Sequence, residues 1–309
     1  MVAYPLVWDD KQHCAVTASS SPVSSGETLT LGRFTLPLPA RPLLMGVLNV
    51  TPDSFSDSGR FADPDAAVAQ FGRMVEEGAE IIDLGGESSR PGAESVDTGE
   101  EWRRVGAVLT RVAANSPVPI SIDTYKAEIA RRAIDSGAVM VNDISALRFD
   151  PEMARVVAET GVTAVLMHML GTPRTMQQNP EYHDVVAEIC SFLEARAQAA
   201  LAAGVPKEKI MVDPGIGFGK TLFHNLLIIG RLKEIVALGY PVLVGASRKS
   251  FIGKISGVDE SDRLEGSLAA AVLAACAGAR IIRTHDVRQT RRALEVCGAV
   301  LHPARFTEN

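Results

Sequence analysis

The 309-residue sequence has little cysteine and no surplus of positive charge. None of its four cysteines stands in a CxxC or Cys/His pattern, which argues against a disulfide framework or a zinc site and predicts reduced thiols in a cytoplasmic protein. The formal net charge is −6, which argues against a nucleic-acid-binding surface but still allows a local basic pocket for an anionic ligand. We therefore expect no nucleic-acid partner.

Long hydrophobic runs are also missing. No stretch approaches the roughly 18 uninterrupted apolar residues of a membrane span. The N-terminal "MVAYPLVWDDKQHC" has neither the charged start nor the apolar run of a signal peptide. The hydrophobic content of 46% and the charged content of 22% are close to globular averages. We therefore expect an intracellular protein with a sizeable core and no membrane partner.

The rest of the sequence follows a regular rhythm. Residues 1–27 are irregular and predict a flexible N-terminal lead-in. The alternation around Gly32 and Arg33 predicts a short hairpin. After it, short apolar runs rich in Val and Ile alternate with segments of helical periodicity, and this pattern predicts parallel βαβ units. The runs are "LLMGVLNV", "EIIDLGG", "VPISID", "AVMVND", "VTAVLMH", "KIMVDPG", "PVLVGAS" and "RIIRTHD".

These eight runs match the number of strands that closes a (β/α)8 barrel. We therefore predict an α/β fold with a single (β/α)8 TIM barrel over residues 28–309, whose bottom is closed by the N-terminal hairpin. The first barrel helix is expected to have Asp63 as its cap and Pro64 in its first turn, and to end at Gly78. A doubly wound open sheet is the main alternative. No shift in composition marks a second domain.

Nearly every predicted strand ends in a polar side chain. In chain order these are Asn49, Asp83, Asp123, Asn142, His168, Asp213, Arg248 with Lys249, and Arg283 with His285. In a barrel, those strand ends converge on one mouth, where such enzymes place their chemistry. A single aspartate there is common in turns and helix caps. A polar residue at every strand end predicts a shared pocket.

Two long polar segments follow the first two predicted strands. "TPDSFSDSG" and "GGESSRPGAESVD" exceed the length of a tight turn, and we expect them to form a lid that excludes water. Arg90 offers an anion contact, and Pro91 stiffens its turn. Asp53 and Asp57 have three open interpretations: they order the closed lid, contact a metal, or cap turns.

Three further segments describe a divided site. "VDPGIGFGKT" fails the GxxxxGK[ST] phosphate-loop pattern, because Pro214 stands where the first glycine belongs. Its glycines let the backbone pass close to a flat ligand, and a turn capped by Asp213 is the alternative. "GASRKSFIG" and "RTHD" bring cations to the last two strands, where barrels often bind phosphate. Asn49 could ligate Mg²⁺ through its amide oxygen, with diphosphate oxygens and waters completing the octahedron.

These segments together resemble the dihydropteroate synthase family of folate biosynthesis, the sulfonamide target. "MGVLNVTPDSFSDSG" is similar to the first signature of that family and "IIDLGGESSRPGA" to its second. "SIDT", "VND", "MHMLGTPRTMQ", "DPGIGFGK", "GASRKS" and "RTHD" follow in the order of the family, over roughly residues 28–300. The resemblance implies a pterin-binding (β/α)8 barrel that joins 6-hydroxymethyl-7,8-dihydropterin diphosphate to para-aminobenzoate, giving 7,8-dihydropteroate and diphosphate. It also implies a Mg²⁺ cofactor and a homodimer through the late barrel helices.

The resemblance further implies roles for individual residues. The residues expected to hold the pterin, or to line its faces, are Asp123, Asn142, Asp213, Lys249, Met167 and Phe218. Those expected on the diphosphate side are Ser89, Arg283 and His285, with Arg90 nearby, and Asn49 is expected to bind Mg²⁺. Those expected around para-aminobenzoate are Phe55, Pro91 and Ser250. The residues expected to carry catalysis are Lys249, Asp123, Asp213, Arg283 and His285.

One departure and two alternatives accompany this interpretation. The family usually has threonine where this chain has Ser89, so a hydroxyl is kept and a methyl contact is lost. A corrinoid-linked methyltetrahydrofolate methyltransferase shares a pterin-binding barrel, but it needs neither a diphosphate-binding rim nor a para-aminobenzoate lid. A non-catalytic pterin-binding paralogue is the second alternative. For the synthase we expect diphosphate to leave before the amine attacks, in an SN1-like reaction.

Overall fold

A computed structural model of the protein describes residues 28–38, 41–51, 63–90 and 92–305. Within these ranges, eight parallel strands form one sheet in the order β8-β7-β6-β5-β4-β3-β10-β9. Their bounds are β3 (Leu43–Asn49), β4 (Ile81–Gly85), β5 (Ile120–Asp123), β6 (Met140–Asp143), β7 (Thr163–Met167), β8 (Ile210–Asp213), β9 (Leu243–Val244) and β10 (Ile281–Thr284). The two edge strands, β8 and β9, meet where Val212 pairs with Val242, and this contact closes the sheet. The Val212 amide donates there to the Pro241 carbonyl at 3.0 Å. The predicted (β/α)8 barrel is confirmed, and the open-sheet alternative is wrong.

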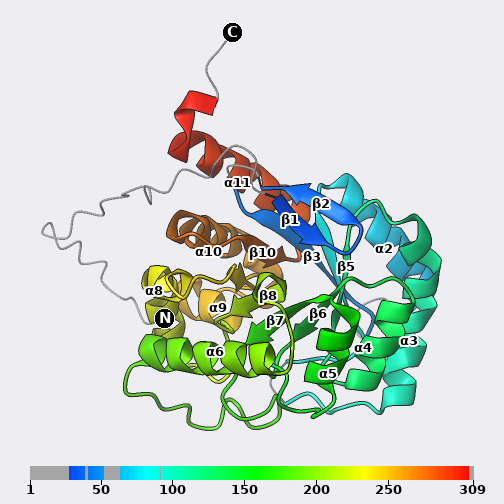
Figure 1. Ribbon diagram of the computed structural model, residues 1–309. Helices are drawn as coiled ribbons and strands as arrows, with labels where there is room; N and C mark the ends of the chain where they lie inside the picture. Colours follow the sequence, from blue (N-terminus) through cyan, green and yellow to red (C-terminus); the bar gives the residue numbers. More distant parts are fainter. Residues whose placement is uncertain (1–27, 39–40, 52–62, 91, 306–309) are drawn as a thin grey trace, which may run out of the picture.

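Helices surround the strands (Figure 1). They are α2 (Pro64–Glu76), α3 (Thr98–Val112), α4 (Ala127–Asp135), α5 (Met153–Thr160), α6 (Val185–Ala202), α7 (Leu222–Gly230), α8 (Leu232–Val236), α9 (Ser250–Ser256), α10 (Leu264–Ala277) and α11 (Val287–Leu301). Short 3₁₀ turns occupy Ala113–Asn115, Lys207–Lys209, Glu260–Asp262 and Pro303–Arg305. Among the described residues, no helix is both long enough and apolar enough to span a bilayer. The cytoplasmic location stays a prediction.

The first barrel helix shows why these sequences form these elements. Asp63 caps α2 by accepting a hydrogen bond from the Asp65 amide at 2.9 Å, and Pro64 opens the helix. Gly78 follows its end with φ +97°, a backbone conformation that favours glycine. Phe71 and Met74 are buried against the strands, in the main core between sheet and helices. The sequence predicted the cap at Asp63, the proline in the first turn and the end at Gly78.

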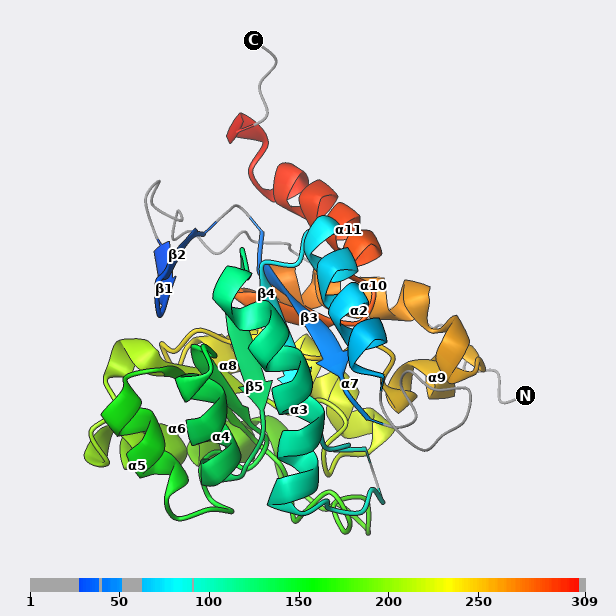
Figure 2. The same ribbon diagram turned by 90° about the vertical axis from the view of Figure 1, so that its right-hand side faces the viewer.

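The bottom of the barrel is closed by a hairpin of β1 (Thr28–Leu31) and β2 (Phe34–Pro37). Figure 2 shows it at the end of the barrel where β3 begins. Leu31 is fully buried in an apolar cluster with inward residues of the strands, including Met45 and Met211. Gly32 turns the hairpin at φ +54°, and a side chain there would collide with Val139. The predicted plug is confirmed, whereas the lead-in of residues 1–27 lies outside the described residues.

Candidate active site

A cavity of about 400 Å³ opens at the ends of the barrel strands. Many of the predicted site residues line it. These are Asn49, Ser89, Arg90, Asp123, Phe218, Lys249, Ser250, Arg283 and His285. They come from the carboxyl ends of β3, β5 and β10 and from loops that follow other strands. Strand ends spread over the whole sequence therefore do converge on one mouth.

Arg283 organises one wall of the cavity. Its Nε donates to Asp83 Oδ2 at 2.6 Å, and its second guanidinium nitrogen donates to Asp123 Oδ2 at 2.9 Å. Asn142 donates its amide to the same Asp83 oxygen at 2.8 Å. Burial, followed by the charge of Asp83, raises the pKa of Asp123 to about 7, and Arg283 acts in the opposite direction. Strands β4, β5, β6 and β10 are thus joined by one charged network.

Lys249 and Asp213 are two further charged groups at this end of the barrel. The Lys249 ammonium lies 4.1 Å from the centre of the Phe218 ring, a cation–π contact. Burial, with the charge of Arg283, lowers the pKa of Lys249 to about 8. Burial also raises the pKa of Asp213 to about 6, although the Gly215 amide donates to its Oδ1 at 2.6 Å. Met167 packs with Phe218 in a small apolar cluster beside them.

Arg283 and His285 point the same way, as their spacing of two residues on a strand predicts. The side chains of Arg283 and His285 differ in charge. Burial and the neighbouring Arg283 lower the pKa of His285 to about 3, so its imidazole is neutral at neutral pH, and its Nδ1 lies 3.1 Å from Ser247 Oγ. The positive charge of the rim therefore comes from arginine and lysine, and a bound anion would favour protonation of His285.

Three predicted pterin residues are buried beside the cavity and do not line it. Asn142 and Asp213 are each 5% exposed and Met167 is 4% exposed. Asn142 bonds the Asp83 oxygen that Arg283 also binds, Met167 belongs to the same apolar cluster as Phe218, and Asp213 feels the charges of Lys249 and Arg283. Together with Asp123 they supply amide and carboxylate groups close to the two cations. The structure thus brings the predicted pterin residues together, while their individual roles stay predictions.

His168 does not face the mouth, contrary to the sequence-based expectation. Its ring packs edge-on against Phe192 of α6, and its Nδ1 contacts Lys220 Nζ at 3.0 Å. Side chains alternate along a strand. Met167, the last residue of β7, faces inward with Phe218, so the next residue faces the surrounding helices. Burial lowers the pKa of His168 to about 2, which keeps the ring neutral.

Arg248 also differs from the expectation that it contacts a ligand directly. It lines the cavity, but its guanidinium forms an ion pair with Asp286, with contacts of 2.5 and 3.1 Å. Its backbone has φ 57°, and the Arg248 amide is held by Ser267 Oγ at 2.9 Å. This conformation directs the following residue, Lys249, to Phe218. The predicted residues Phe55 and Pro91, and the unassigned Asp53 and Asp57, lie outside the described residues.

The structure adds two lysines that the sequence interpretation missed. Lys220, only 3% exposed, donates to the carbonyls of Phe218 and His168 at 2.8 and 3.3 Å. Lys126 contacts Glu87, a residue of the cavity wall, at 2.6 Å. Lysine in a single sequence gives no sign of burial, and the partners of these two lie up to 52 positions away. Only the short spacing between Lys220 and Phe218 offered a local signal.

The surroundings of Asn49 allow a Mg²⁺ ion. Its Oδ1 lies 3.4 Å from where a side-chain carbon would stand at Gly85, so the glycine keeps space open beside the amide oxygen. Within the described ranges, no group of three or more His, Cys, Asp or Glu side chains is placed to hold a metal. An ion at this position would therefore need substrate oxygens and waters as its other ligands, the arrangement that Mg²⁺ favours at phosphate sites.

Comparisons with known proteins place the chain in a family. A sequence model of the family described as pterin binding enzyme matches residues 45–285. Dihydropteroate synthase of Escherichia coli strain K12 is 47% identical over 262 residues, which cover 85% of this chain and 93% of that protein.

Solved structures agree with this match. The Xanthomonas albilineans dihydropteroate synthase with 4-aminobenzoic acid has a TM-score of 0.83 at 46% identity, covering 88% of this chain and 97% of that one. The same enzyme in complex with 7,8-dihydropteroate has a TM-score of 0.80 at 44% identity, covering 89% and 98%. The chain therefore belongs to the pterin-binding enzyme family and, within it, to the dihydropteroate synthases.

Proposed function

We propose that this protein condenses 6-hydroxymethyl-7,8-dihydropterin diphosphate with para-aminobenzoate, releasing diphosphate and 7,8-dihydropteroate. One observation carries the proposal: a single cavity is lined by the carboxylate of Asp123 and by the cations Arg283 and Lys249, and the buried groups of Asn142 and Asp213 lie beside it. The first set suits the donor-rich edge of a pterin, and the second suits a diphosphate. The related enzyme binds 4-aminobenzoic acid and 7,8-dihydropteroate, which are a substrate and the product of the proposed reaction, and this supports the proposal.

In the proposed reaction, buried acceptors orient the pterin. Asp213 is 5% exposed, and its ionised carboxylate would accept hydrogen bonds from the amino-pyrimidine edge. A buried ligand donor without such an acceptor would lose affinity, since unsatisfied polar groups are costly away from water. Asn142 and Asp123 supply further polar groups, and Phe218 and Met167 belong to one apolar cluster nearby.

The cationic rim then stabilises the leaving group. In the proposed reaction, Arg283 and Lys249 would face the negative charge that develops on the departing diphosphate, and fixed charges in a site with little water stabilise such charge strongly. The electron-rich pterin can stabilise the exocyclic CH₂ cation, so departure can precede attack by the weakly nucleophilic aryl amine. No covalent bond to the protein is required. A bound Mg²⁺, held by Asn49, would further neutralise the diphosphate oxygens.

The synthase proposal is tested by measuring diphosphate release. Purified protein is supplied with the dihydropterin diphosphate, with and without para-aminobenzoate and Mg²⁺. We expect release that depends on both additions and is abolished by EDTA. Tight pterin binding without release would instead indicate the non-catalytic paralogue. Methyl transfer from methyltetrahydrofolate to a corrinoid would indicate the other alternative, which the comparisons do not favour. Sulfonamide inhibition can be measured in the same assay.

We also propose a homodimer that forms through α10 and α11. These helices pack against each other, and they expose Leu273, Val296 and Val300 by 57%, 66% and 73%. Neighbouring exposed apolar side chains of this kind are typical of interaction surfaces. Light scattering after size-exclusion chromatography should give a dimer mass for the wild-type protein and a monomer mass for Leu273→Glu. A monomeric wild-type protein would contradict the proposal.

A further inference from the structure

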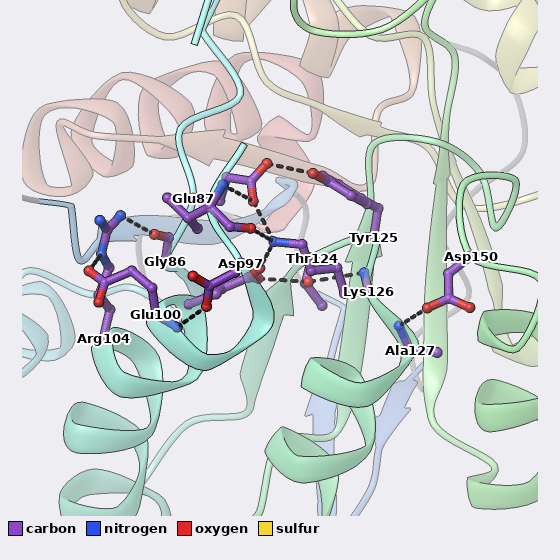
Figure 3. A network of polar contacts seen from close by, with 12 residues as sticks. Gly86, Glu87, Asp97, Glu100, Arg104, Thr124, Tyr125, Lys126, Ala127 and Asp150 are labelled. Carbon is purple, nitrogen blue, oxygen red and sulfur yellow. Dashed lines mark hydrogen bonds and ion pairs between the residues drawn. The ribbon is translucent and has the colours of Figure 1, made fainter. Parts of the chain in front are cut away.

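A buried ion cluster lies beside the cavity, between the loop that follows β4 and the start of α4 (Figure 3). At its centre, Lys126 Nζ lies 2.6 Å from Glu87 Oε2, from Glu101 Oε2 and from the Val96 carbonyl oxygen. The Glu101 side chain is 1% exposed and that of Lys126 is 16% exposed. One ammonium is thus shared by two carboxylates that are largely shielded from water. Neither the chemistry proposed above nor the sequence patterns assign it a role.

The cluster joins both ends of the loop to two helices. Glu87 stands at the start of residues 87–96 and Val96 at the end, so Lys126 ties the ends of this segment to each other. Val96 also donates its amide to Glu87 Oε2 at 3.3 Å. Glu101 belongs to α3, and Lys126 is the residue that precedes α4. The segment is therefore fixed at its base, from both sides, by one side chain.

Neighbouring contacts support the same geometry. Tyr125 donates its hydroxyl to Glu87 Oε1 at 2.6 Å, and Thr124 donates to Glu101 Oε1 at 2.7 Å. Figure 3 shows Tyr125 and Lys126 reaching Glu87 from different directions. Arg104 of α3 donates to the Gly86 carbonyl at 2.9 Å, just before the segment. A buried carboxylate pair is stable only while its charge is balanced and its hydrogen bonds are made.

Two residues that line the cavity are carried by this segment. Ser89 and Arg90 follow Glu87 by two and three positions and face the cavity. Arg90 also forms a 2.9 Å ion pair with Glu260, but both side chains are largely exposed, and such pairs contribute little to stability. The Gly92 amide also donates to the Pro173 carbonyl at 3.2 Å, so the placement of Ser89 and Arg90 depends on this backbone contact and on the charged base of the loop.

We propose that Lys126 is a positioning residue, which holds Glu87 and Val96 together and thereby places Ser89 and Arg90 at the cavity. The proposal rests on the synthase function proposed above. Without the ammonium, Glu87 and Glu101 repel each other, and the arrangement that places Ser89 and Arg90 at the cavity becomes a smaller fraction of the population. A substrate that needs this arrangement then binds more weakly by that fraction, while the rate at saturation is unchanged. Lys126 thus acts on binding through the loop and touches no substrate.

The test compares Lys126→Met with Lys233→Met, the same change at an exposed lysine of α8. We expect Lys126→Met to raise the KM for the dihydropterin diphosphate about tenfold, which equals about 1.4 kcal/mol. The kcat should stay within about threefold, and the Kd for 6-hydroxymethylpterin, which lacks the diphosphate, within about twofold. Amide hydrogen exchange should accelerate in residues 86–97 and not elsewhere. Lys233→Met should leave all four quantities unchanged.

Two outcomes would overturn the inference: an unchanged KM with faster exchange in the loop, or a fall in kcat with unchanged KM. Glu87→Gln provides a second variant if Lys126→Met does not fold, because it keeps the shape of the side chain and removes the loop-side charge. It should raise the same KM by a smaller factor, and an unchanged KM there would also reject the proposal. Inactive wild-type protein would refute the synthase function itself, whereas active wild-type protein with an unaffected variant would refute only the role of Lys126.

Discussion

The two ends of the barrel are built from the same strands and differ in almost every physical respect. At the bottom, Leu31 of the hairpin and inward residues such as Met45 and Leu243 form a dry apolar cluster. At the mouth, the same strands carry Asp83 and Arg283, whose charges are buried and paired. Barrel enzymes keep chemistry at the mouth and stability at the bottom. This chain follows that division within strands only a few residues long.

The difference is electrostatic as well as structural. Burial raises the pKa values of Asp123 and Asp213 to about 7 and 6, and lowers that of Lys249 to about 8. Each shift records a charged form that the fold disfavours. Such groups are retained where binding or catalysis needs them, at the expense of stability. Changes at the mouth should therefore reduce function without unfolding the protein, and changes at the bottom should do the reverse.

The largest expected effect is that of Asp213→Ala on pterin binding. Removal of the buried acceptor leaves donors of the bound pterin unsatisfied, and we expect the affinity to fall about 1000-fold, or about 4 kcal/mol. Titration calorimetry with the dihydropterin diphosphate measures this loss. Because the folded-state pKa of Asp213 is raised to about 6, its stabilising contribution is present only at low pH and is lost as the pH rises through that value. At pH 8 the variant should unfold at the same or a higher temperature.

A suitable control for that variant is Asp184→Ala. Asp184 caps α6 by accepting from the amides of Val186 and Ala187, and it does not line the cavity. Its removal should lower stability by about 1 kcal/mol, as the loss of a helix cap does, without any change in pterin affinity. Retained pterin affinity in Asp213→Ala would mean that the pterin site is wrongly assigned.

The next effect concerns the bottom of the barrel. Leu31 is fully buried under the strands, and Leu31→Ala should lower the free energy of unfolding by about 3 kcal/mol, because a cavity replaces the side chain. Urea unfolding measures the loss. The kcat/KM at a temperature where the variant is folded should equal that of the wild-type protein. A large fall in kcat/KM would show that the two ends are coupled and that their separation is incomplete.

The sequence could predict the barrel, the plug and the mouth because each depends on local pattern. Period-two alternation around Gly32 and cap residues such as Asp63 and Pro64 act over a few positions. It was harder to predict which side chain at a strand end faces the cavity, because a shift of one residue reverses the direction. Met167 faces the cavity side, whereas His168, the next residue, faces α6. A strand ending one residue earlier than expected is sufficient to reverse the assignment.

The partners of buried lysines could not be predicted at all. Lys126 pairs with Glu87 and Glu101 across 39 and 25 positions, and Lys220 reaches back 52 positions to His168. Such pairs follow from tertiary packing and leave no periodic signal. The same limit explains why His285 was expected as a basic group. Its neutral state follows from burial and from the charge of Arg283, which only the folded chain brings together.

A smaller effect should appear in the pH dependence of pterin affinity. The acceptor form of Asp213 is the ionised carboxylate, and burial raises its pKa to about 6. Affinity should therefore be fully present above about pH 7 and fall as the pH is lowered through 6, by up to about tenfold per unit, or about 1.4 kcal/mol. Calorimetry between pH 5 and 8 checks this. Asp213→Asn should bind weakly at every pH, and a step near pH 6 that survives in this variant would assign the titration to another group.

The smallest effect is expected at Ser89, where the chain departs from the threonine usual in the family it resembles. Ser89 lines the cavity and is half-buried, so Ser89→Thr keeps the hydroxyl and adds one methyl group at the rim. A methyl group gains at most about 0.8 kcal/mol when fully buried, and here it is only partly covered. The KM for the dihydropterin diphosphate should therefore fall by less than about threefold, with kcat and stability unchanged. Ser89→Ala, which removes the hydroxyl and adds no methyl group, is the informative comparison. If Ser89→Thr weakens binding more than Ser89→Ala does, the rim has no room for the methyl group, and the position selects for serine because of space.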